Sequence, residues 1–344
     1  MPFNISKLKK LRELLAVNRV DLYLICNPLE LRYFLDMEVE GILVVSQNKN
    51  YTYLITDGRY QHQLQNIENN NVRVVLANNG YLKGLSKLVN RYQKGKKLGV
   101  EGTISLELYL KLKNEFKNLT SLFLIRELRM IKDREEITRI KKAVEITRTV
   151  INGIRNKAIG KQEKEIKAYL EYRIQSLGGD GSAFSPIVAS GANSAYPHAY
   201  PRDKKISKFL LVDCGAKYRG YCADLTRMLF WDKIPKVIKR AYEVVIEAKQ
   251  LALSLVKEGQ VIKDVVTRVE NYIKREGFKD NIYHGLGHGL GLEVHELPYI
   301  NRYNTQKLRA GMVVTIEPGL YFPGLGGVRS EDVVVVEKDK GVVL

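Results

Sequence analysis

Apolar residues recur at different spacings along this chain, and the pattern divides it into two parts. Over the first 125 residues, short apolar runs alternate with segments in which apolar residues return every three or four positions. Strands are predicted at 21–26, 42–46, 51–56, 72–76, 98–101 and 121–125, and helices at 5–17, 29–34, 81–92 and 106–117. Residues 47–50 predict a hairpin turn between two of these strands. Strands alternating with helices indicate an α/β domain with a mixed sheet.

After residue 126 the pattern becomes two helix pairs, each followed by strands. Helices are predicted at 131–157, 161–177, 236–256 and 261–275, with Asp133 as the N-cap of the first. Strands are predicted at 184–190, 208–213, 221–230, 312–318 and 327–336. The repeated order indicates an internal pseudo-repeat. We therefore predict two domains, 1–125 and 126–344.

Composition narrows the class of protein. The chain has 344 residues, of which 45% are hydrophobic and 27% charged, as in soluble globular proteins. Its net charge of +18 is spread over both domains without a basic stripe, so we expect no nucleic-acid partner. A lysine-rich thermophile surface is another source of this charge. Three cysteines are too few for a disulfide scaffold and fit the cytoplasm, and we expect no signal peptide or membrane span.

Residues 283–295, YHGLGHGLGLEVH, concentrate candidate chemistry. They hold three of the five histidines in the chain, His284, His288 and His295. Histidine titrates near neutrality and is the commonest metal ligand, and the interspersed glycines would let backbone approach a ligand closely. Surface histidines beside a flexible loop are the alternative interpretation. Carboxylates suited to a metal site on both sides of this segment argue against that alternative.

Two aspartates follow apolar runs in neighbouring predicted strands. If Asp213 pairs directly opposite Asp224 in an antiparallel ladder, both side chains emerge on one face of the sheet. A shared cation would relieve their repulsion, whereas solvation at a sheet edge is the alternative. In this register Cys214 and Cys222 point to opposite faces, so we expect them not to form a disulfide.

Two glutamates complete a candidate ligand set. Glu317 and Glu331 each lie inside a strongly apolar predicted strand, where burial requires a compensating charge. With the two aspartates and His288 they make four carboxylates and one imidazole. Such an oxygen-rich set suits two divalent ions of the manganese or cobalt kind better than a tetrahedral structural zinc. A two-metal site can hold a bridging hydroxide for hydrolysis.

Five segments resemble, in the same order, the motifs of the pita-bread metallopeptidases, specifically the Xaa-Pro peptidase branch of prolidase and aminopeptidase P. They are FSPIVASGANSAYPH (184–198), VDCGAKYRGYCADLTR (212–227), HGLGHGLGLEVHELP (284–298), TIEPGLY (315–321) and GVRSEDVVVV (327–336). The resemblance implies an α+β fold with a C-terminal pita-bread catalytic domain and a smaller creatinase-type α/β domain before it. It also implies a homodimer that hydrolyses proline-containing peptides with a dinuclear metal centre.

The resemblance further implies a role for each candidate residue. The ligands of two divalent ions, manganese or cobalt first and zinc as an alternative, would be Asp213, Asp224, His288, Glu317 and Glu331. Catalysis would involve His198, His295 and Glu317, with Glu317 taking the proton of the attacking water. Substrate contacts would come from His198, His284, His295 and Arg329, and Arg329 could also hydrogen-bond a ligand carboxylate.

Within this branch we prefer an Xaa-Pro dipeptidase, and an aminopeptidase acting on longer peptides is the alternative. The modest length favours the compact prolidase-like forms. However, some prolidases are expected to carry an arginine near position 299, where this chain has Tyr299, with Arg302 nearby. The N-terminal domain and the PHAYP segment at 197–201 argue against methionine aminopeptidase, and the complete ligand set argues against creatinase. A non-catalytic binding module is a further alternative, but such a protein would be expected to have lost ligands.

Overall fold

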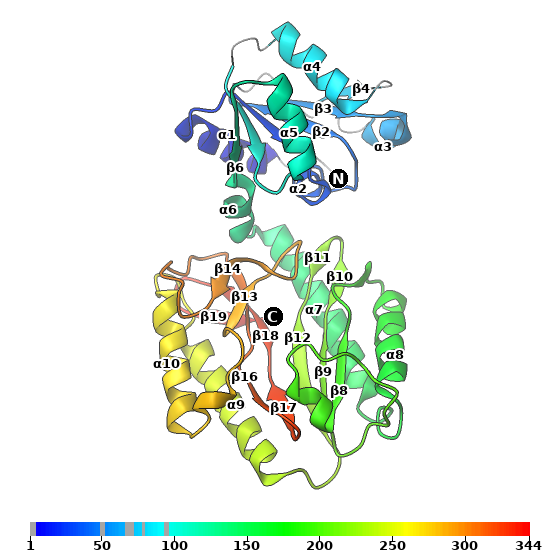
Figure 1. Cartoon of the computed structure of the whole chain (residues 1–344), viewed down its shortest axis with the longest axis vertical. Coiled ribbons are helices and arrows are strands. Elements are labelled where there is room, and N and C mark those ends of the chain that lie inside the picture. Colours follow the sequence, from blue (N-terminus) through cyan, green and yellow to red (C-terminus); the bar gives the residue numbers. More distant parts are fainter. Residues whose placement is uncertain (1–4, 49–51, 66–71, 78–79, 93–95) are drawn as a thin grey trace. The chain divides into compact units, whose positions relative to one another are not determined.

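The computed structural model describes residues 5–48, 52–65, 72–77, 80–92 and 96–344. The chain forms two compact units, Met1–Leu128 and Arg129–Leu344 (Figure 1). Helix α6 (Leu124–Met130) spans the junction, and the boundary predicted between residues 125 and 126 stays a prediction. No described helix is long and apolar enough to cross a membrane.

The N-terminal unit is the predicted α/β arrangement around a mixed sheet. Its described strands have the order β4-β3-β2-β1-β5-β6. Pairing is antiparallel between β1, β2 and β3 and parallel elsewhere. The strands are β1 (Leu22–Ile25), β2 (Ile42–Ser46), β3 (Thr52–Thr56), β4 (Arg73–Leu76), β5 (Leu98–Glu101) and β6 (Leu119–Leu122). The helices before α6 are α1 (Ile5–Val17), α2 (Pro28–Leu35), α3 (Gln61–Leu64), α4 (Tyr81–Tyr92) and α5 (Leu106–Glu115).

Most predicted elements of this unit are present, and one has the wrong bounds. The β2–β3 hairpin is confirmed, although residues 49 and 50 of its turn lie outside the described residues. The bounds of the strand predicted at 121–125 are wrong, because β6 covers Leu119–Leu122 and helix α6 begins at Leu124. A short apolar run fits a strand and a buried helix equally well, so periodicity alone could not separate them.

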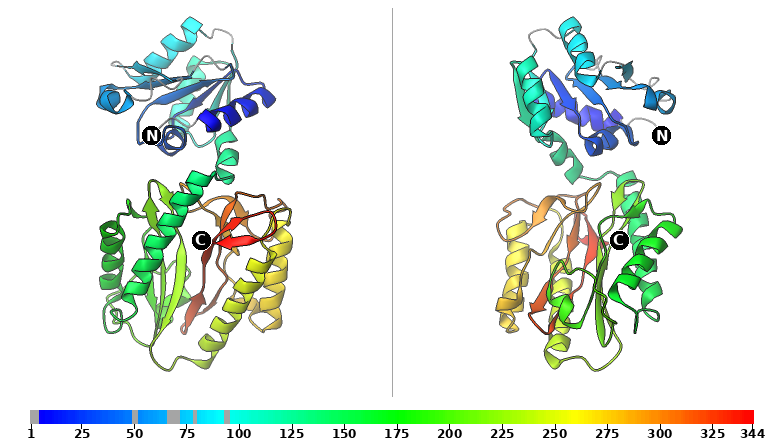
Figure 2. Two further views of the ribbon diagram at one scale, coloured as in Figure 1. Left: turned by 180° about the vertical axis from the view of Figure 1, so that it is seen from behind. Right: turned by 45° about the vertical axis from the view of Figure 1, so that its right-hand side comes forward.

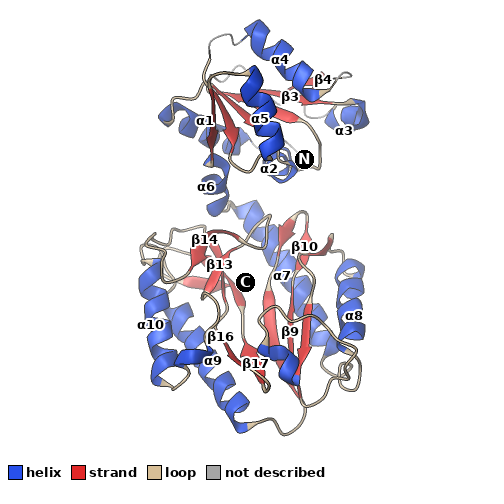
Figure 3. Ribbon diagram, in the orientation of Figure 1, coloured by secondary structure: helices blue, strands red, loops and turns tan. Residues whose placement is uncertain are grey.

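The C-terminal unit contains two helix pairs, each lying on the outer side of its own sheet (Figures 2 and 3). The helices are α7 (Arg134–Ile154), α8 (Glu163–Ser176), α9 (Lys236–Leu255) and α10 (Ile262–Arg275). The first pair is followed by strands β7 (Gly181–Ser182), β8 (Ile187–Ser190), β9 (Phe209–Cys214), β10 (Ala216–Tyr218), β11 (Tyr221–Cys222) and β12 (Leu225–Phe230). The second pair is followed by β13 (Gly287–Gly289), β14 (Glu296–Ile300), β15 (Val313–Ile316), β16 (Gly319–Phe322), β17 (Gly326–Arg329), β18 (Asp332–Val336) and β19 (Gly341–Val343). The element order therefore repeats as predicted.

Sheet topology brings the two halves of this unit together. Described strands form sheets of order β12-β9-β8 and β14-β13-β15-β18-β19, with smaller sheets β16-β17 and β11-β10-β7.

Asp133 caps α7 as predicted, and its side chain and that of Glu136 form a reciprocal capping box. Small and branched residues on one face of α9, such as Ala241, Val245 and Ala248, are fully buried and let this helix pack closely on the sheet behind it.

Two predicted strands are in fact interrupted, and one predicted register is wrong. Residues 221–230 form β11 and β12, and residues 327–336 form β17 and β18 in different sheets. Asp213 pairs with Thr226 rather than with Asp224. Asp224 itself lies outside this ladder, in the gap between β11 and β12. Cys214 and Cys222 are free, as predicted.

The N-terminal unit also buries a carboxylate whose titration can be tested. Glu101 ends β5, is 1% exposed, and accepts hydrogen bonds from the backbone N–H groups of Cys26 and Asn27 at 2.8 and 2.9 Å. Burial raises the pKa of Glu101 from 4.5 to about 8, against the lowering effect of the Cys26 N–H, and the nearby Glu30 carboxylate adds to the rise. The folded protein therefore keeps a proton that the unfolded chain has released.

We expect this proton to make stability depend on pH. The stabilising contribution is complete below pH 4.5 and is lost as the pH rises to about 8, because the folded state binds the extra proton throughout that range. Urea denaturation followed by circular dichroism should show a smaller fall in stability for Glu101→Gln than for the unsubstituted protein. The fluorescence of Trp231, the single tryptophan, follows unfolding of the C-terminal unit and serves as the control. Identical pH dependence in the two proteins would contradict this prediction.

Candidate active site

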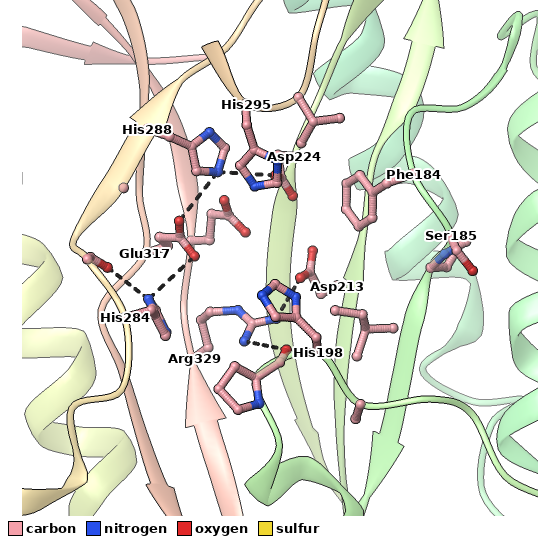
Figure 4. A pocket seen from close by; sticks show the side chains of 18 of the residues that line it. Phe184, Ser185, His198, Asp213, Asp224, His284, His288, His295, Glu317 and Arg329 are labelled. Atoms are coloured by element: carbon pink, nitrogen blue, oxygen red, sulfur yellow. Dashed lines mark hydrogen bonds and ion pairs between the residues drawn. The ribbon is translucent and has the colours of Figure 1, made fainter. Parts of the chain in front are cut away.

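A cavity of about 480 Å³ lies between the two halves of the C-terminal unit. It is lined by all nine residues predicted from the sequence, namely His198, Asp213, Asp224, His284, His288, His295, Glu317, Arg329 and Glu331. Figure 4 shows most of their side chains converging from both sheets and from the loop that follows β8. Segments more than a hundred residues apart in the sequence therefore meet in one place.

The carboxylates of this cavity stand where strands end or break. Asp213 is the penultimate residue of β9, and Asp224 lies in the gap between β11 and β12. Glu317 directly follows β15, and Glu331 lies between β17 and β18. The prediction that both glutamates lie inside strands is therefore wrong. At Asp224, Glu317 and Glu331 the chain lies outside the regular strands, so these three side chains are free of the in-and-out alternation of a continuous strand.

The same side chains offer a set of atoms suited to divalent cations. The His288 Nε2 atom is 3.7 Å from Asp224 Oδ2 and 3.4 Å from Glu317 Oε1. Ligand atoms of Asp224, His288 and Glu331 all lie within 4.8 Å of one another. One buried oxygen of each of Asp213, Asp224 and Glu331 has no hydrogen-bond partner in the described part of the chain. Buried acceptors without donors are what cations would satisfy, so the residues fit a metal centre.

Electrostatics support the same conclusion. Burial raises the pKa of Asp224 well above its usual range, and repulsion from Glu331, Asp213 and Glu317 raises it further. Burial and the charges of Glu317 and Asp213 likewise raise the pKa of Glu331. The pKa of Glu317 rises to about 7, chiefly through burial. Carboxylates crowded in this way stay ionised at neutral pH when positive charge is placed among them.

His288 is oriented as a metal ligand would be. Its Nδ1 atom lies 3.1 Å from the carbonyl of Gly289, and since a carbonyl only accepts, this hydrogen bond places the proton on Nδ1. Nε2 is left without a proton and faces the carboxylates. Burial, and next the neighbouring His295, lower the pKa of His288 to about 4, which keeps the imidazole neutral.

The glycines beside His288 serve close packing of the backbone. A Cβ atom on Gly287 would lie 2.0 Å from the carbonyl oxygen of Thr315, and one on Gly289 would lie 2.2 Å from that of Leu297. Glycine is therefore required for β13 to fit between its neighbours. The sequence predicted that these glycines let backbone approach a ligand, whereas the close approach observed is to neighbouring backbone carbonyls.

Arg329 is the single lysine or arginine among the residues that line the cavity within the described chain. Its Nη2 donates to Asp213 Oδ2 at 2.5 Å, and its Nε donates to Thr226 Oγ1 at 2.9 Å. The Thr226 hydroxyl in turn donates to Glu331 Oε2 at 2.8 Å. Arg329 therefore holds one carboxylate directly and a second through Thr226, in agreement with the contact predicted for it.

His284 belongs to the same network. Arg329 Nη1 donates to the Tyr321 hydroxyl oxygen at 2.7 Å, and this hydroxyl lies 2.8 Å from His284 Nε2. The His284 Nδ1 atom lies 2.8 Å from the Gly285 carbonyl, which requires the proton on Nδ1 and leaves Nε2 to accept from Tyr321. Burial, reinforced by the charge of Arg329, lowers the pKa of His284 to about 4. His284 is thus a fixed, neutral part of the wall.

The other two histidines approach the carboxylates from loops. The ring of His295 lies 4.3 Å from that of His288, centroid to centroid. The His295 side chain is exposed, and partial desolvation of its ring lowers its pKa. His198 lies near Arg329 and Asp213 in Figure 4 and comes from the loop between β8 and β9. Both side chains line the cavity.

A buried ionic cluster holds the His295 segment from behind. Glu296 follows His295 and pairs with Lys132 at 2.7 Å and with Arg129 at 2.6 Å. Arg129 also pairs with Glu293 at 2.7 Å. Although burial alone would raise it, the two cations hold the pKa of Glu296 below its usual value. The loop is therefore anchored on both sides of His295.

Several supporting residues were not predicted from the sequence. Tyr321 lies within the TIEPGLY motif, four residues after Glu317, and Thr226 lies two residues after Asp224. Their proximity to candidate ligands in the sequence was the available signal. Glu296 directly follows His295 within the motif at 284–298, whereas Lys132 lies in none of the motifs and is joined to Glu296 across more than 160 residues.

Comparison with known proteins places these motifs in a family. Residues 138–338 match Metallopeptidase family M24, and residues 7–131 match the Creatinase/Prolidase N-terminal domain. An Xaa-Pro dipeptidase from Pyrococcus furiosus is 34% identical over 343 residues, covering 97% of this chain and 96% of that protein. These matches confirm the resemblance and the two-part architecture predicted from the sequence.

Solved structures give the same result. The structure of an Xaa-Pro dipeptidase from Bacillus anthracis superposes with a TM-score of 0.92 at 31% identity, covering 98% of this chain and 96% of that one. An X-Pro aminopeptidase from Thermotoga maritima superposes with a TM-score of 0.86 at 33% identity, covering 94% of this chain and 95% of that one. The similarity to solved structures therefore extends over both units. One of these structures is named a dipeptidase and the other an aminopeptidase.

The cluster behind His295 can be tested through stability. Lys132→Met leaves the buried Glu296 with Arg129 as its remaining cation, and breaking a buried ion pair typically costs about 3–5 kcal/mol. We expect the free energy of unfolding to fall by about 3 kcal/mol, near the lower end of this range, in urea denaturation followed by Trp231 fluorescence. Lys142→Met, which removes an exposed partner of Glu145, should change stability by less than about 1 kcal/mol. Equal losses in the two variants would show that the buried cluster has no special role.

Proposed function

The chain belongs to Metallopeptidase family M24, and from this premise we propose that it is an Xaa-Pro dipeptidase. It would hydrolyse the bond that precedes proline in dipeptides, as a metal-dependent exopeptidase. The observation that carries this proposal is the convergence of four carboxylates, three of them buried, and a neutral imidazole on one cavity. The names of the Pyrococcus furiosus and Bacillus anthracis relatives support the choice of substrate.

We assign two divalent metal ions to Asp213, Asp224, His288, Glu317 and Glu331. Manganese or cobalt fits this oxygen-rich set best, and zinc is the alternative. When bound, such a pair lowers the pKa of a water molecule and polarises a carbonyl group. The orphaned oxygens of Asp213, Asp224 and Glu331 support the assignment.

The side chains of the site have separate tasks in this proposal. Glu317 accepts the proton of the attacking water, as a carboxylate in hydrogen-bond reach of that water can do. His198 and His295 donate hydrogen bonds to the oxygen of the tetrahedral intermediate. The acidic groups attract the free amino group of the substrate, which favours cleavage at the N-terminal end.

Apolar residues and the missing amide hydrogen of proline account for the choice of bond. Phe184, Ile187 and Val294 line the cavity beside the polar groups and offer a surface for a pyrrolidine ring. An Xaa-Pro bond has no N–H, so the site needs no acceptor for that hydrogen. The volume of about 480 Å³ lies within the range of sites for small ligands.

An aminopeptidase acting on longer peptides is the second candidate, and one observation favours it. Tyr299 lines the cavity and is 50% exposed, where an arginine would bind the carboxylate of a dipeptide. Arg302 does not line the cavity, and its guanidinium donates instead to the hydroxyl of Tyr303 at 2.8 Å. The C-terminal unit therefore offers no uncommitted cation for a substrate carboxylate among its described cavity-lining residues.

We also propose a cytoplasmic homodimer built from domains 1–125 and 126–344. The free state of all three cysteines suits a reducing compartment. The dimer rests on the family resemblance, and sedimentation velocity measurements on the full chain would decide it.

Metal binding gives the first test of this function. Glu331→Gln keeps the shape of the side chain but removes the charge that a shared ion requires. After reconstitution with manganese and dialysis, we expect about two ions per chain in the unsubstituted protein and fewer in the variant, with activity reduced by roughly 100-fold or more. Glu337→Gln, which changes an exposed carboxylate six residues away, is the control. Full metal content and activity in Glu331→Gln would exclude this residue as a ligand.

Substrate length separates the two candidate activities. Metal-loaded protein should hydrolyse Xaa-Pro dipeptides with a higher kcat/KM than Xaa-Pro-Xaa tripeptides carrying the same first two residues. Amidated dipeptides would show whether a free carboxylate is recognised. If tripeptides are cleaved as well as dipeptides, the aminopeptidase assignment replaces the dipeptidase assignment.

A further inference from the structure

The loop that carries His198 connects two strands and supplies a large part of the cavity wall. It runs from the end of β8 at Ser190 to Arg202, before β9 begins. Its second half contributes Pro197, His198, Ala199, Tyr200 and Pro201 to the lining. A loop lacks the hydrogen bonds of a strand ladder, so other contacts must hold this loop if His198 is to keep one position.

One buried carboxylate supplies anchors at both ends of this loop. Glu163 is the first residue of α8 and is 0% exposed. Its Oε1 accepts from the Ser190 backbone N–H at 2.6 Å, and its Oε2 accepts from the Arg202 backbone N–H at 2.8 Å. The loop is therefore fastened to the same side chain where it begins and where it ends.

A third contact extends this arrangement to the middle of the loop. Asn193 Nδ2 donates to Glu163 Oε2 at 2.8 Å and to the carbonyl of Tyr200 at 3.1 Å. On the cavity side, Arg329 Nη1 donates to the carbonyl of Pro197 at 3.3 Å. His198 thus lies between a contact with the active-site arginine and the contacts made by Glu163.

Glu163 has N–H donors as partners and no cation among the described residues. The neighbouring lysines pair elsewhere, Lys161 with Glu165 at 3.7 Å and Lys164 with Asp203 at 2.7 Å. All three of its partners are donors, so both oxygens serve as acceptors, which is the arrangement that an ionised carboxylate satisfies. A buried carboxylate is stable only while such donors are in place, so the position of the loop and the burial of Glu163 depend on each other.

We propose that Glu163 is a positioning residue that holds loop 190–202 in place and thereby sets the position of His198 in the active site. The catalytic consequence rests on the proposed function, whereas the anchoring of the loop does not. Glu163 itself does not line the cavity, so its effect on substrate would pass through the loop.

The substitution Glu163→Gln tests the anchoring directly. The amide has the shape of the carboxylate but replaces one acceptor oxygen by an NH₂ group, so at least one loop donor faces another donor whichever way the amide is turned. In the metal-loaded full chain we expect the amides of Ser190 and Arg202 to exchange hydrogen on the order of tenfold faster or more. Hydrogen exchange with fragment-resolved mass spectrometry measures this change.

Glu165→Gln is the matched control. Glu165 lies in the same first turn of α8, and its carboxylate accepts from the backbone N–H of Gln162 at 2.7 Å without touching the loop. This variant removes the same charge from the same helix end, so it should leave exchange in 190–202 and peptidase activity unchanged. Unchanged exchange in Glu163→Gln, or equally faster exchange in both variants, would overturn the proposal.

A double-mutant cycle tests the consequence for catalysis. Glu163→Gln should lower kcat/KM for an Xaa-Pro dipeptide by roughly tenfold, and much less when His198 is already alanine, because the two residues then act as one unit. A purely structural defect would give the same fold-change in both backgrounds, and this result would exclude positioning of His198. If the unsubstituted protein cleaves no Xaa-Pro peptide, the proposed function fails while the exchange measurement still decides the role of Glu163.

Discussion

Uncompensated negative charge in the cavity of the C-terminal unit is the constraint on which the rest of the site depends. Asp213, Asp224, Glu317 and Glu331 meet there against one buried cation, Arg329. Isolated buried ions carry penalties of several kcal/mol each, and opposite charge recovers them only when it is close and well oriented. The pKa values of Asp224, Glu317 and Glu331 are raised for the same reason, because burial and mutual repulsion favour the neutral, protonated form of each carboxyl group. Bound divalent cations would supply the positive charge that Arg329 alone does not provide.

The fold meets this constraint by placing the carboxylates at discontinuities of its sheets. A continuous strand directs successive side chains to opposite faces, which limits how many charges it can aim at one point. Breaks between β11 and β12 and between β17 and β18 free Asp224 and Glu331 from this alternation. Arg329 and Thr226 then hold the ligand oxygens in place through hydrogen bonds at 2.5–2.9 Å. Contacts made by the chain itself therefore orient these carboxylates.

The histidine-bearing loops are stabilised by polar groups on the side away from the cavity. Glu296 is held by Lys132 and Arg129 next to His295, and Glu163 binds three donors around the loop of His198. Glu296, the first residue of β14, is held by two side-chain cations, whereas Glu163 accepts hydrogen bonds from two backbone N–H groups and one side-chain amide. Loops that look flexible from their glycine and alanine content are thus held by specific long-range contacts.

The sequence alone determined most of the helices and strands, the N-cap of α7 and nine of the residues that line the cavity. These follow from local patterns and from motifs whose members stand close together in the chain. Tertiary structure decided the two-residue register shift between β9 and β12, the strand breaks at Asp224 and Glu331, and the change from strand to helix after Leu122. It also decided the roles of Glu163, Lys132 and Glu296. Register and buried pairing depend on which distant segments come into contact, and a one-dimensional pattern of apolar and polar residues does not contain that information.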